Sequence, residues 1–324
     1  MTTMTTMMST DGREGDRRSR ICGFLVGVLG LTVALCASGR ADAAGSGPGP
    51  LPTVRIGSTN FTEQLVVAEL YGQVLEAHGY RVERRLNLGN REIVAPALES
   101  GQIDMVPEYL ATYVAYLTKD KSKASTDPVA TRRNLQEALT PRHLTVLDFA
   151  PAVDTNGFVV TKETAGKYQA TRLSDLAPVA GQLVLGAPPE CPDRPFCIPG
   201  LRQVYGITFK DYKALDAGGP LTVAALVGKQ IDVALLFTTD AVIAAKGLVL
   251  LQDDRRLQLA DNIAPVVRDD LLAKVPADFR SLLDGVTAKI TTEEITALNL
   301  KVGLEKQDPR AVAGAWLTQK GFVK

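Results

Sequence analysis

The chain has 324 residues with 36 basic and 36 acidic side chains, and 45% of its residues are apolar. This composition is typical of a folded soluble protein, and the balanced charge excludes the basic surplus that nucleic-acid binding needs. Because the chain holds only two histidines, we expect neither histidine-based catalysis nor a histidine-rich metal site, and we expect no cofactor. The length favours two domains.

The first 43 residues are typical of an export signal. Four arginines between positions 13 and 20 precede an uncharged 15-residue run, Ile21 to Leu35, and a small-residue site ends at Ala43. The run is short for a membrane span, which needs about 20 residues. Cys36 ends a sequence similar to a lipobox, so we expect a lipid anchor at Cys36, with simple cleavage after Ala43 as the alternative. Residues 44–52, rich in Gly and Pro, predict a flexible tether.

The following segment alternates strands with helices. Short strands are predicted at 54–57, 81–86 and 103–106, and a helix at 92–100. An earlier helix follows from apolar residues at helical spacing: Val67, Leu70, Tyr71, Val74 and Leu75. Asn60 with Glu63 predicts a capping box at its start. This order predicts an α/β fold with mainly parallel sheets and flanking helices, in which ligands bind beyond the carboxyl ends of the strands.

An internal repeat indicates two similar lobes. Residues 97–104 are echoed, at an offset of 128, by residues 225–232, and an aromatic follows each copy five residues later, Tyr109 or Phe237. Two such lobes would each present one aromatic to a shared cleft, although a chance likeness between common helix-turn-strand units is the alternative. We expect lobe 1 over 53–155, lobe 2 over 156–257, and a return to lobe 1 with C-terminal helices over 258–324. Two crossings between lobes predict a hinge.

Cys191 and Cys197 are the only cysteines after the export signal. Export makes a disulfide between them the default, with two free thiols as the alternative. The sequence lacks the G-x-S-x-G, H-E-x-x-H and phosphate-loop motifs of common enzymes. A secreted α/β enzyme therefore stays only as an alternative, and Glu108 is expected to be a structural hydrogen-bonding carboxylate.

Several runs resemble the substrate-binding proteins of osmoprotectant ABC importers, those for glycine betaine, carnitine and choline. They are Ile56–Gln64, Leu86–Gly89, Ile103–Tyr109, Val204–Gly206, Thr238–Asp240 and Ala264–Arg268. The resemblance implies a two-lobed, hinged periplasmic-binding-protein fold of the second type, without chemistry on the ligand. It also implies a monomer outside the cytoplasm that delivers a small molecule to an ABC permease. A receptor in place of the permease stays open.

In this family an aromatic cage holds a quaternary ammonium by cation–π attraction. The resemblance and the predicted binding rim give the ligand-binding set Asn60, Gln64, Arg91, Tyr109, Thr112, Asn156, Phe237 and Thr238. Phe237 and Asn156 stand where relatives usually have tyrosines, and the loop of Cys191 offers Phe196 at best as a fourth aromatic. The reduced cage leaves a second ligand class open, namely a flat hydroxylated or aromatic molecule.

Overall fold

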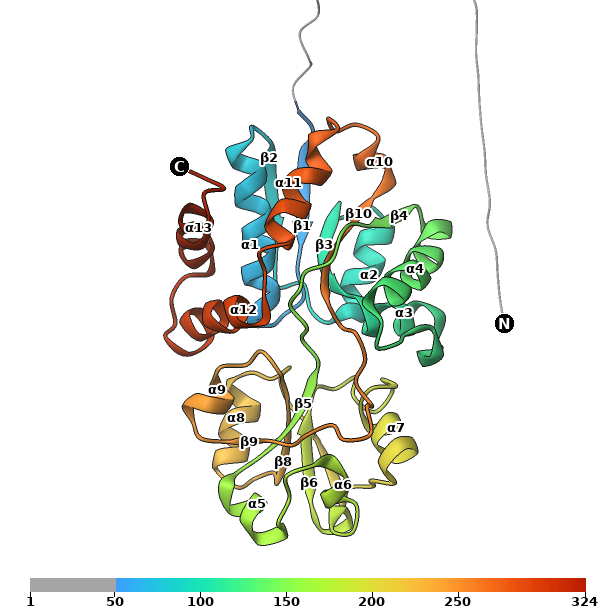
Figure 1. The fold of residues 1–324 in the computed structure, drawn as a ribbon, viewed down its shortest axis with the longest axis vertical. Coiled ribbons are helices and arrows are strands. Elements are labelled where there is room, and N and C mark those ends of the chain that lie inside the picture. Colours follow the sequence, from blue (N-terminus) through green and yellow to red (C-terminus); the bar gives the residue numbers. More distant parts are fainter. Residues whose placement is uncertain (1–50) are drawn as a thin grey trace, which may run out of the picture. The chain divides into compact units, whose positions relative to one another are not determined.

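The computed structural model describes residues 51–324, which form two α/β lobes joined by two chain segments (Figure 1). The predicted two-lobed α/β architecture is therefore confirmed. The export signal, Cys36 and residues 44–50 of the tether lie outside the described residues. Within residues 51–324, no helix has the length and apolar character that crossing a bilayer requires.

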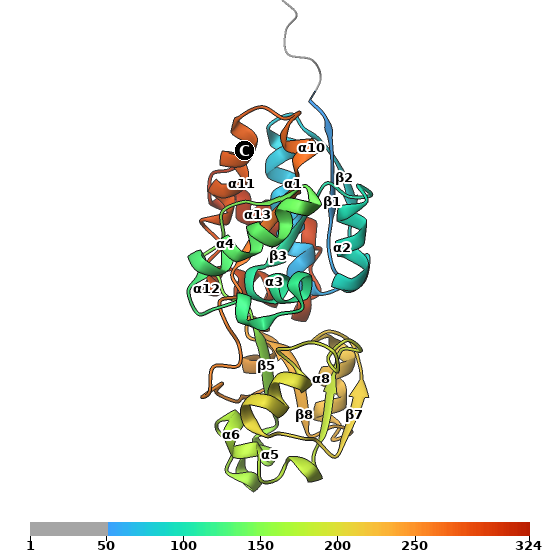
Figure 2. The same cartoon turned by 90° about the vertical axis from the view of Figure 1, so that its right-hand side faces the viewer.

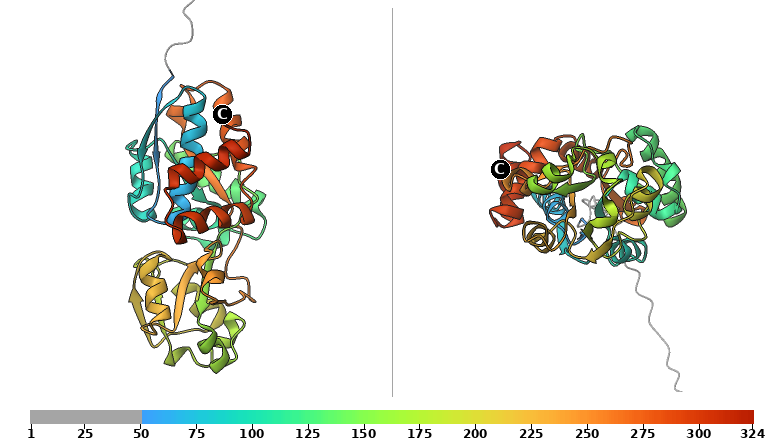
Figure 3. Two further views of the ribbon diagram at one scale, coloured as in Figure 1. Left: turned by 90° about the vertical axis from the view of Figure 1, so that its left-hand side faces the viewer. Right: turned by 90° about the horizontal axis from the view of Figure 1, so that it is seen from below.

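The first lobe is built on a five-stranded sheet in the order β2-β1-β3-β10-β4. Its strands are β1 (Thr53–Gly57), β2 (Arg81–Arg85), β3 (Met105–Tyr109), β4 (Leu144–Val146) and β10 (Ile263–Arg268). Its helices are α1 (Thr62–Ala77), α2 (Arg91–Glu99), α3 (Leu110–Thr118), α4 (Pro128–Leu139), α10 (Asp269–Leu272), α11 (Asp278–Thr287), α12 (Thr292–Asn299) and α13 (Pro309–Gln319). Figure 2 shows α2 on one side of this sheet, and Figure 3 shows α1 and the C-terminal helices covering the other.

The second lobe repeats this plan with the strand order β7-β6-β8-β5-β9. Its strands are β5 (Asn156–Val160), β6 (Val184–Ala187), β7 (Asp211–Ala214), β8 (Val233–Phe237) and β9 (Val249–Leu250). Its helices are α5 (Lys162–Tyr168), α6 (Leu173–Leu176), α7 (Ile198–Gly200), α8 (Pro220–Val227) and α9 (Val242–Ala245). Along β8, Val233 and Leu235 pack into one hydrophobic cluster and Ala234 and Leu236 into another, as expected for a strand buried on both faces.

Each sheet contains one strand that runs against the others. β10 pairs antiparallel with β3 and β4, and β5 pairs antiparallel with β8 and β9. The remaining pairs are parallel. Both reversed strands enter their sheet directly after the chain has crossed from the other lobe. The sheets are therefore mixed, with four of five strands in each pointing the same way, which refines the prediction of mainly parallel sheets.

The first helix confirms one prediction and corrects another. All five apolar residues predicted to share a face of α1 are fully buried. The capping box is wrong, because the N-cap position is Phe61 and no side chain caps the helix. Glu63 is only 2% exposed and faces the interior of the protein, where its carboxylate has other partners.

The internal repeat corresponds to equivalent positions in the two sheets. The Asp104 carboxylate accepts the Arg55 backbone N–H, and the Asp232 carboxylate accepts that of Val184, both at 2.8 Å. The backbone N–H groups of the two aspartates donate back to the carbonyls of the same residues at 2.7 and 2.9 Å. The repeated Gln-Ile-Asp turn therefore connects β1 to the start of β3 in the first lobe, and β6 to the start of β8, the equivalent strands, in the second.

The isoleucine of this turn explains a glycine in each neighbouring strand. A Cβ atom at Gly57 would lie 2.4 Å from a methyl carbon of Ile103, and one at Gly186 would lie 2.4 Å from a methyl carbon of Ile231. Both isoleucines are buried and fill the space that a side chain would need. Tyr109 and Phe237, each five residues after the aspartate of this turn, stand at the carboxyl ends of equivalent strands, β3 and β8.

Candidate functional site

One cavity between the lobes is lined by most of the residues that were predicted to bind ligand. It encloses about 70 Å³ and is lined by Asn60, Gln64, Arg91, Tyr109, Thr112, Asn156 and Phe237 from that set. Thr238 does not line it. The Thr238 hydroxyl instead accepts the backbone N–H of Thr155 at 2.9 Å and donates to Asp154 at 3.2 Å, within the first crossing between lobes.

Three aromatic rings stand together at the cavity, and Phe61 joins the two predicted ones. Its ring centroid is 6.1 Å from that of Tyr109 and 4.7 Å from that of Phe237, with interplanar angles of 27° and 29°. Phe61 was not predicted, although it lies inside the run that carried the resemblance. Phe61 is the residue of extended backbone that precedes α1, and its ring packs against the other two rings.

The expected fourth aromatic is absent from the cavity. Phe196 is only 3% exposed and does not line the cavity, because its ring packs into the core of the second lobe. Its backbone carbonyl accepts the side-chain amides of Asn156 at 3.1 Å and Gln258 at 3.0 Å. Asn156, which stands where a cage tyrosine was expected, therefore anchors this loop through its amide.

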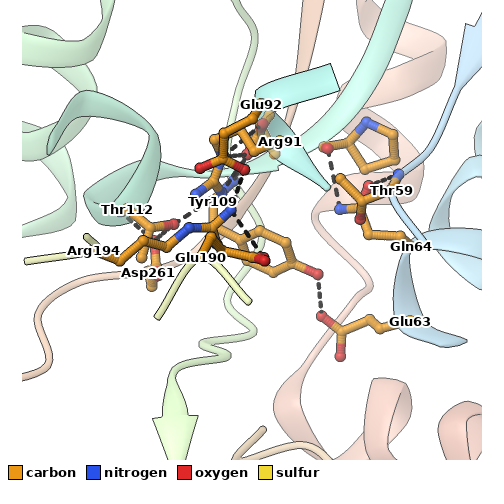
Figure 4. Close-up of polar contacts among 12 residues, drawn as sticks. Thr59, Glu63, Gln64, Arg91, Glu92, Tyr109, Thr112, Glu190, Arg194 and Asp261 are labelled. Atoms are coloured by element: carbon orange, nitrogen blue, oxygen red, sulfur yellow. Dashed lines mark hydrogen bonds and ion pairs between the residues drawn. The ribbon is translucent and has the colours of Figure 1, made fainter. Parts of the chain in front are cut away.

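Tyr109 is held by a buried carboxylate. Its hydroxyl donates to Glu63 at 2.7 Å (Figure 4). Glu63 also accepts the hydroxyl of Thr239 at 2.6 Å and the amide of Asn299 at 2.9 Å. Burial raises the pKa of Glu63, and these three hydrogen bonds partly oppose that shift. Because Thr239 belongs to the second lobe, Glu63 both orients the ring of Tyr109 and contacts the opposite lobe.

Arg91 makes its ionic contacts inside the protein. Its guanidinium donates to the Glu108 carboxylate at 2.7 Å and to the Thr112 hydroxyl at 2.9 Å, and both members of the ion pair are buried. Burial by itself would lower the pKa of Arg91. The negative charge of Glu108 and its hydrogen bonds outweigh this effect, so the pKa is raised and the guanidinium stays charged. Glu108 is therefore the structural carboxylate that was expected, and Arg91 is its partner.

Gln64 and Thr112 are also engaged by neighbours. The Gln64 side chain accepts the Thr59 backbone N–H at 3.3 Å and donates to the Pro107 carbonyl at 3.1 Å. Thr112 donates its backbone N–H to Asp261 at 2.9 Å. Burial raises the pKa of Asp261 to about 6. These residues fix the shape of the cavity wall, while the Asn60 side chain is exposed.

The predicted disulfide between Cys191 and Cys197 is present and closes a loop against the cavity. The loop carries Arg194, which donates to Glu92 of α2 at 2.9 Å and pairs with Glu190 at 3.2 Å. The Asn90 amide of the first lobe donates to Glu190 at 3.3 Å. Polar contacts therefore join the disulfide loop of the second lobe to the first lobe.

Replacing both Cys191 and Cys197 by serine is expected to lower the free energy of unfolding by about 2 kcal/mol, because the bond closes only a short loop in the unfolded chain. Urea unfolding of the double variant and of the oxidised wild type measures the difference. Adding a reductant to the wild type should reproduce the loss and leave the double variant unchanged. A reductant effect of equal size in both proteins would contradict the prediction.

The lining has more acidic than basic side chains. It contains four acidic side chains, Glu108, Asp154, Glu190 and Asp261, but only two basic ones, Arg91 and Arg194. It includes no histidine, and its two cysteines form the disulfide. Within residues 51–324, no three His, Cys, Asp or Glu side chains are placed to hold a metal ion. Ring faces in an acidic cavity can bind a cation.

The chain is similar to several proteins of known role. Residues 52–319 match the family model described as the substrate binding domain of the ABC-type glycine betaine transport system. Glycine betaine-binding protein YehZ of Escherichia coli K12 is 30% identical over 281 residues, which cover 84% of this chain and 92% of the relative. Carnitine transport binding protein OpuCC of Listeria monocytogenes (strain 10403S) is 28% identical over 308 residues, 93% of this chain and 97% of the relative.

A solved structure has the same fold over nearly its whole length. It is described as a glycine betaine/carnitine/choline ABC transporter and is 26% identical to this chain. The match has a TM-score of 0.65 and covers 83% of this chain and 99% of that chain.

Proposed function

Because the chain belongs to the family of substrate binding domains of ABC-type glycine betaine transport systems, we propose that it captures a small quaternary-ammonium compound between its lobes and delivers it to an ABC permease. Members of the family serve transport, and the proposal includes no chemistry on the ligand. The relatives named for glycine betaine and carnitine support this ligand class.

One observation carries the proposal, namely the stacked rings of Phe61, Tyr109 and Phe237 in a lining with more acidic than basic side chains. A cation gains from an aromatic face because the ring quadrupole is negative there, and methyl groups gain by leaving water. Acidic surroundings add attraction for positive charge. A quaternary ammonium is the group that satisfies both conditions.

We also propose where and how the chain works. Residues 1–43 would direct export and, through Cys36, anchor the chain to a membrane by a lipid, with residues 44–52 as tether. Lobe 1 over 53–155 and lobe 2 over 156–257 would close on the ligand as a monomer, and residues 258–324 would complete lobe 1. Mass spectrometry of the cell-derived protein tests the anchor, because a lipid adds a defined mass at Cys36.

Calorimetric titration of the purified protein tests the ligand class. Glycine betaine, carnitine and choline are titrated beside a panel of hydroxylated aromatic molecules. We expect saturable binding of at least one quaternary ammonium and none of the uncharged aromatics. Binding restricted to the aromatic panel would favour the alternative ligand class, and absence of binding to every quaternary ammonium would reject the proposal.

Phe237→Ala is expected to weaken binding of the quaternary ammonium by about 5- to 30-fold, the equivalent of one lost cation–π contact. Phe209→Ala is the matched control, because Phe209 is a partly buried phenylalanine of the same lobe that does not line the cavity. The dissociation constant of the quaternary ammonium from Phe209→Ala should equal that from the wild type. Equal effects of the two substitutions would show that the ligand does not contact Phe237.

A further inference from the structure

Asp154 is a buried acid that faces the ligand cavity without a cation beside it. It lies in the first crossing between lobes, is 3% exposed and lines the cavity. Its carboxylate accepts the Thr239 backbone N–H and the Thr238 hydroxyl, both at 3.2 Å. Neither partner carries charge, so the Asp154 carboxyl group has no ionic partner among residues 51–324.

The surroundings of Asp154 add negative charge. The ionisable groups that act on it are Glu63 from α1 and Asp240 from the turn after β8, and the charge of Asp154 acts in turn on Tyr109 from β3. No basic side chain acts on Glu63 or on Asp240. Burial first, and then the charges of Glu63 and Asp240, raise the pKa of Asp154 well above its usual range. The raised pKa favours the protonated carboxyl group, and a positive charge bound in the cavity would lower the pKa and favour the carboxylate.

The two arginines of the lining, in contrast, are already paired with acids. Arg91 is bound by Glu108. Arg194 contacts both Glu92, at 2.9 Å, and Glu190, at 3.2 Å (Figure 4). The Nε–H group of Arg194 is buried without a hydrogen-bond partner. The positive charge of Arg194 is nevertheless paired with two carboxylates, those of Glu92 and Glu190. A ligand carboxylate would therefore find no unpaired cation, whereas a ligand cation finds an unpaired carboxylate.

A second polar group of the lining also has no partner in the protein. The Thr59 side chain is only 8% exposed, and its hydroxyl makes no hydrogen bond within the described residues. Thr59 lines the same cavity as Asp154, but its hydroxyl oxygen is itself enclosed by protein, so the unpaired group that a ligand can meet in the cavity is the carboxyl group of Asp154. That carboxyl group matches a ligand with a net positive charge.

We propose that Asp154 is the counter-ion of the ligand's quaternary ammonium, so that the cavity selects a net-positive amino alcohol such as choline over a net-neutral zwitterion such as glycine betaine. This inference rests on the proposed function, whose ligand class it narrows. Charge on Asp154 takes over part of the attraction that the absent cage tyrosine at Asn156 would supply.

The test compares three probes by calorimetry on the purified wild type. They are choline, glycine betaine and 3,3-dimethylbutan-1-ol, which has the shape of choline without its charge. We expect choline to bind on the order of 10-fold or more tighter than either of the others. Glycine betaine binding more tightly than choline would overturn the inference and leave the proposed function standing. Binding of none of the three would instead count against both.

Asp154→Asn then isolates the counter-ion. It should weaken choline on the order of 10- to 100-fold, since it removes a desolvated charge partner, and leave the uncharged alcohol within about twofold. Asp261→Asn, which replaces another buried aspartate of the lining, should change choline binding less. Equal losses for choline and the alcohol, or an equal loss of choline binding in Asp261→Asn, would overturn the assignment. The wild-type ranking decides the question if Asp154→Asn does not fold.

Discussion

Arg91→Ala is expected to lower the free energy of unfolding by about 3–5 kcal/mol, because it leaves the Glu108 carboxylate buried without its counter-charge. Glu108 is 2% exposed, and Arg91 supplies three of the hydrogen bonds to its carboxylate, at 2.7, 3.0 and 3.1 Å. Urea unfolding at neutral pH, without ligand, measures the loss. The protein without ligand is used because Arg91 also lines the cavity.

Two further variants distinguish the stability lost because the ion pair is buried from the stability lost by removing any arginine. Arg132→Ala removes the partner of Asp148 in an exposed pair at 3.3 Å, together with hydrogen bonds to the carbonyls of Leu147 at 2.8 Å and Val146 at 3.2 Å, and should cost about 1–2 kcal/mol. The double variant Arg91→Met with Glu108→Leu removes both charges and should recover much of the stability. If Arg91→Ala and Arg132→Ala cost the same, Glu108 has access to water that the structure does not show.

Features encoded by local spacing could be predicted from the sequence. The buried face of α1 follows from apolar residues that recur at helical spacing. The disulfide follows from two cysteines six positions apart in an exported chain. Tyr109 and Phe237 could be placed at one cavity because a repeated turn precedes each by the same number of residues.

Features that depend on contacts between distant segments could not be predicted from the sequence. Glu63 fits a capping box by its spacing from Asn60, and nothing local indicates that Thr239 and Asn299, 176 and 236 positions away, surround its carboxylate. Arg91, at the start of α2, has the charge to bind a ligand, but the competing acid, Glu108, lies on β3, 17 positions away. The sequence nevertheless held one usable signal, since Phe61 lies in the same resembling run as Gln64.

The repeat also permits a prediction in which each lobe serves as the control for the other. Asp104→Ala is expected to lower the free energy of unfolding by about 2–4 kcal/mol, whereas Asp232→Ala should cost about 1–2 kcal/mol. Both variants remove a hydrogen bond to a backbone N–H, of Arg55 or Val184, at the same point of the sheet. Only Asp104 also accepts two bonds from the Arg55 guanidinium, at 2.8 and 2.5 Å.

Arg55→Met distinguishes the two contributions, because it removes the guanidinium and keeps the backbone N–H. In that background, Asp104→Ala should cost the same as Asp232→Ala in the wild type, since only the bond shared by the two lobes remains to be lost. Urea unfolding of the two single variants and of the pair with Arg55→Met completes this comparison. If Asp104→Ala still cost about twice as much in the Arg55→Met background, the two turns would differ in the backbone bond itself, and the repeat would not mark equivalent positions energetically.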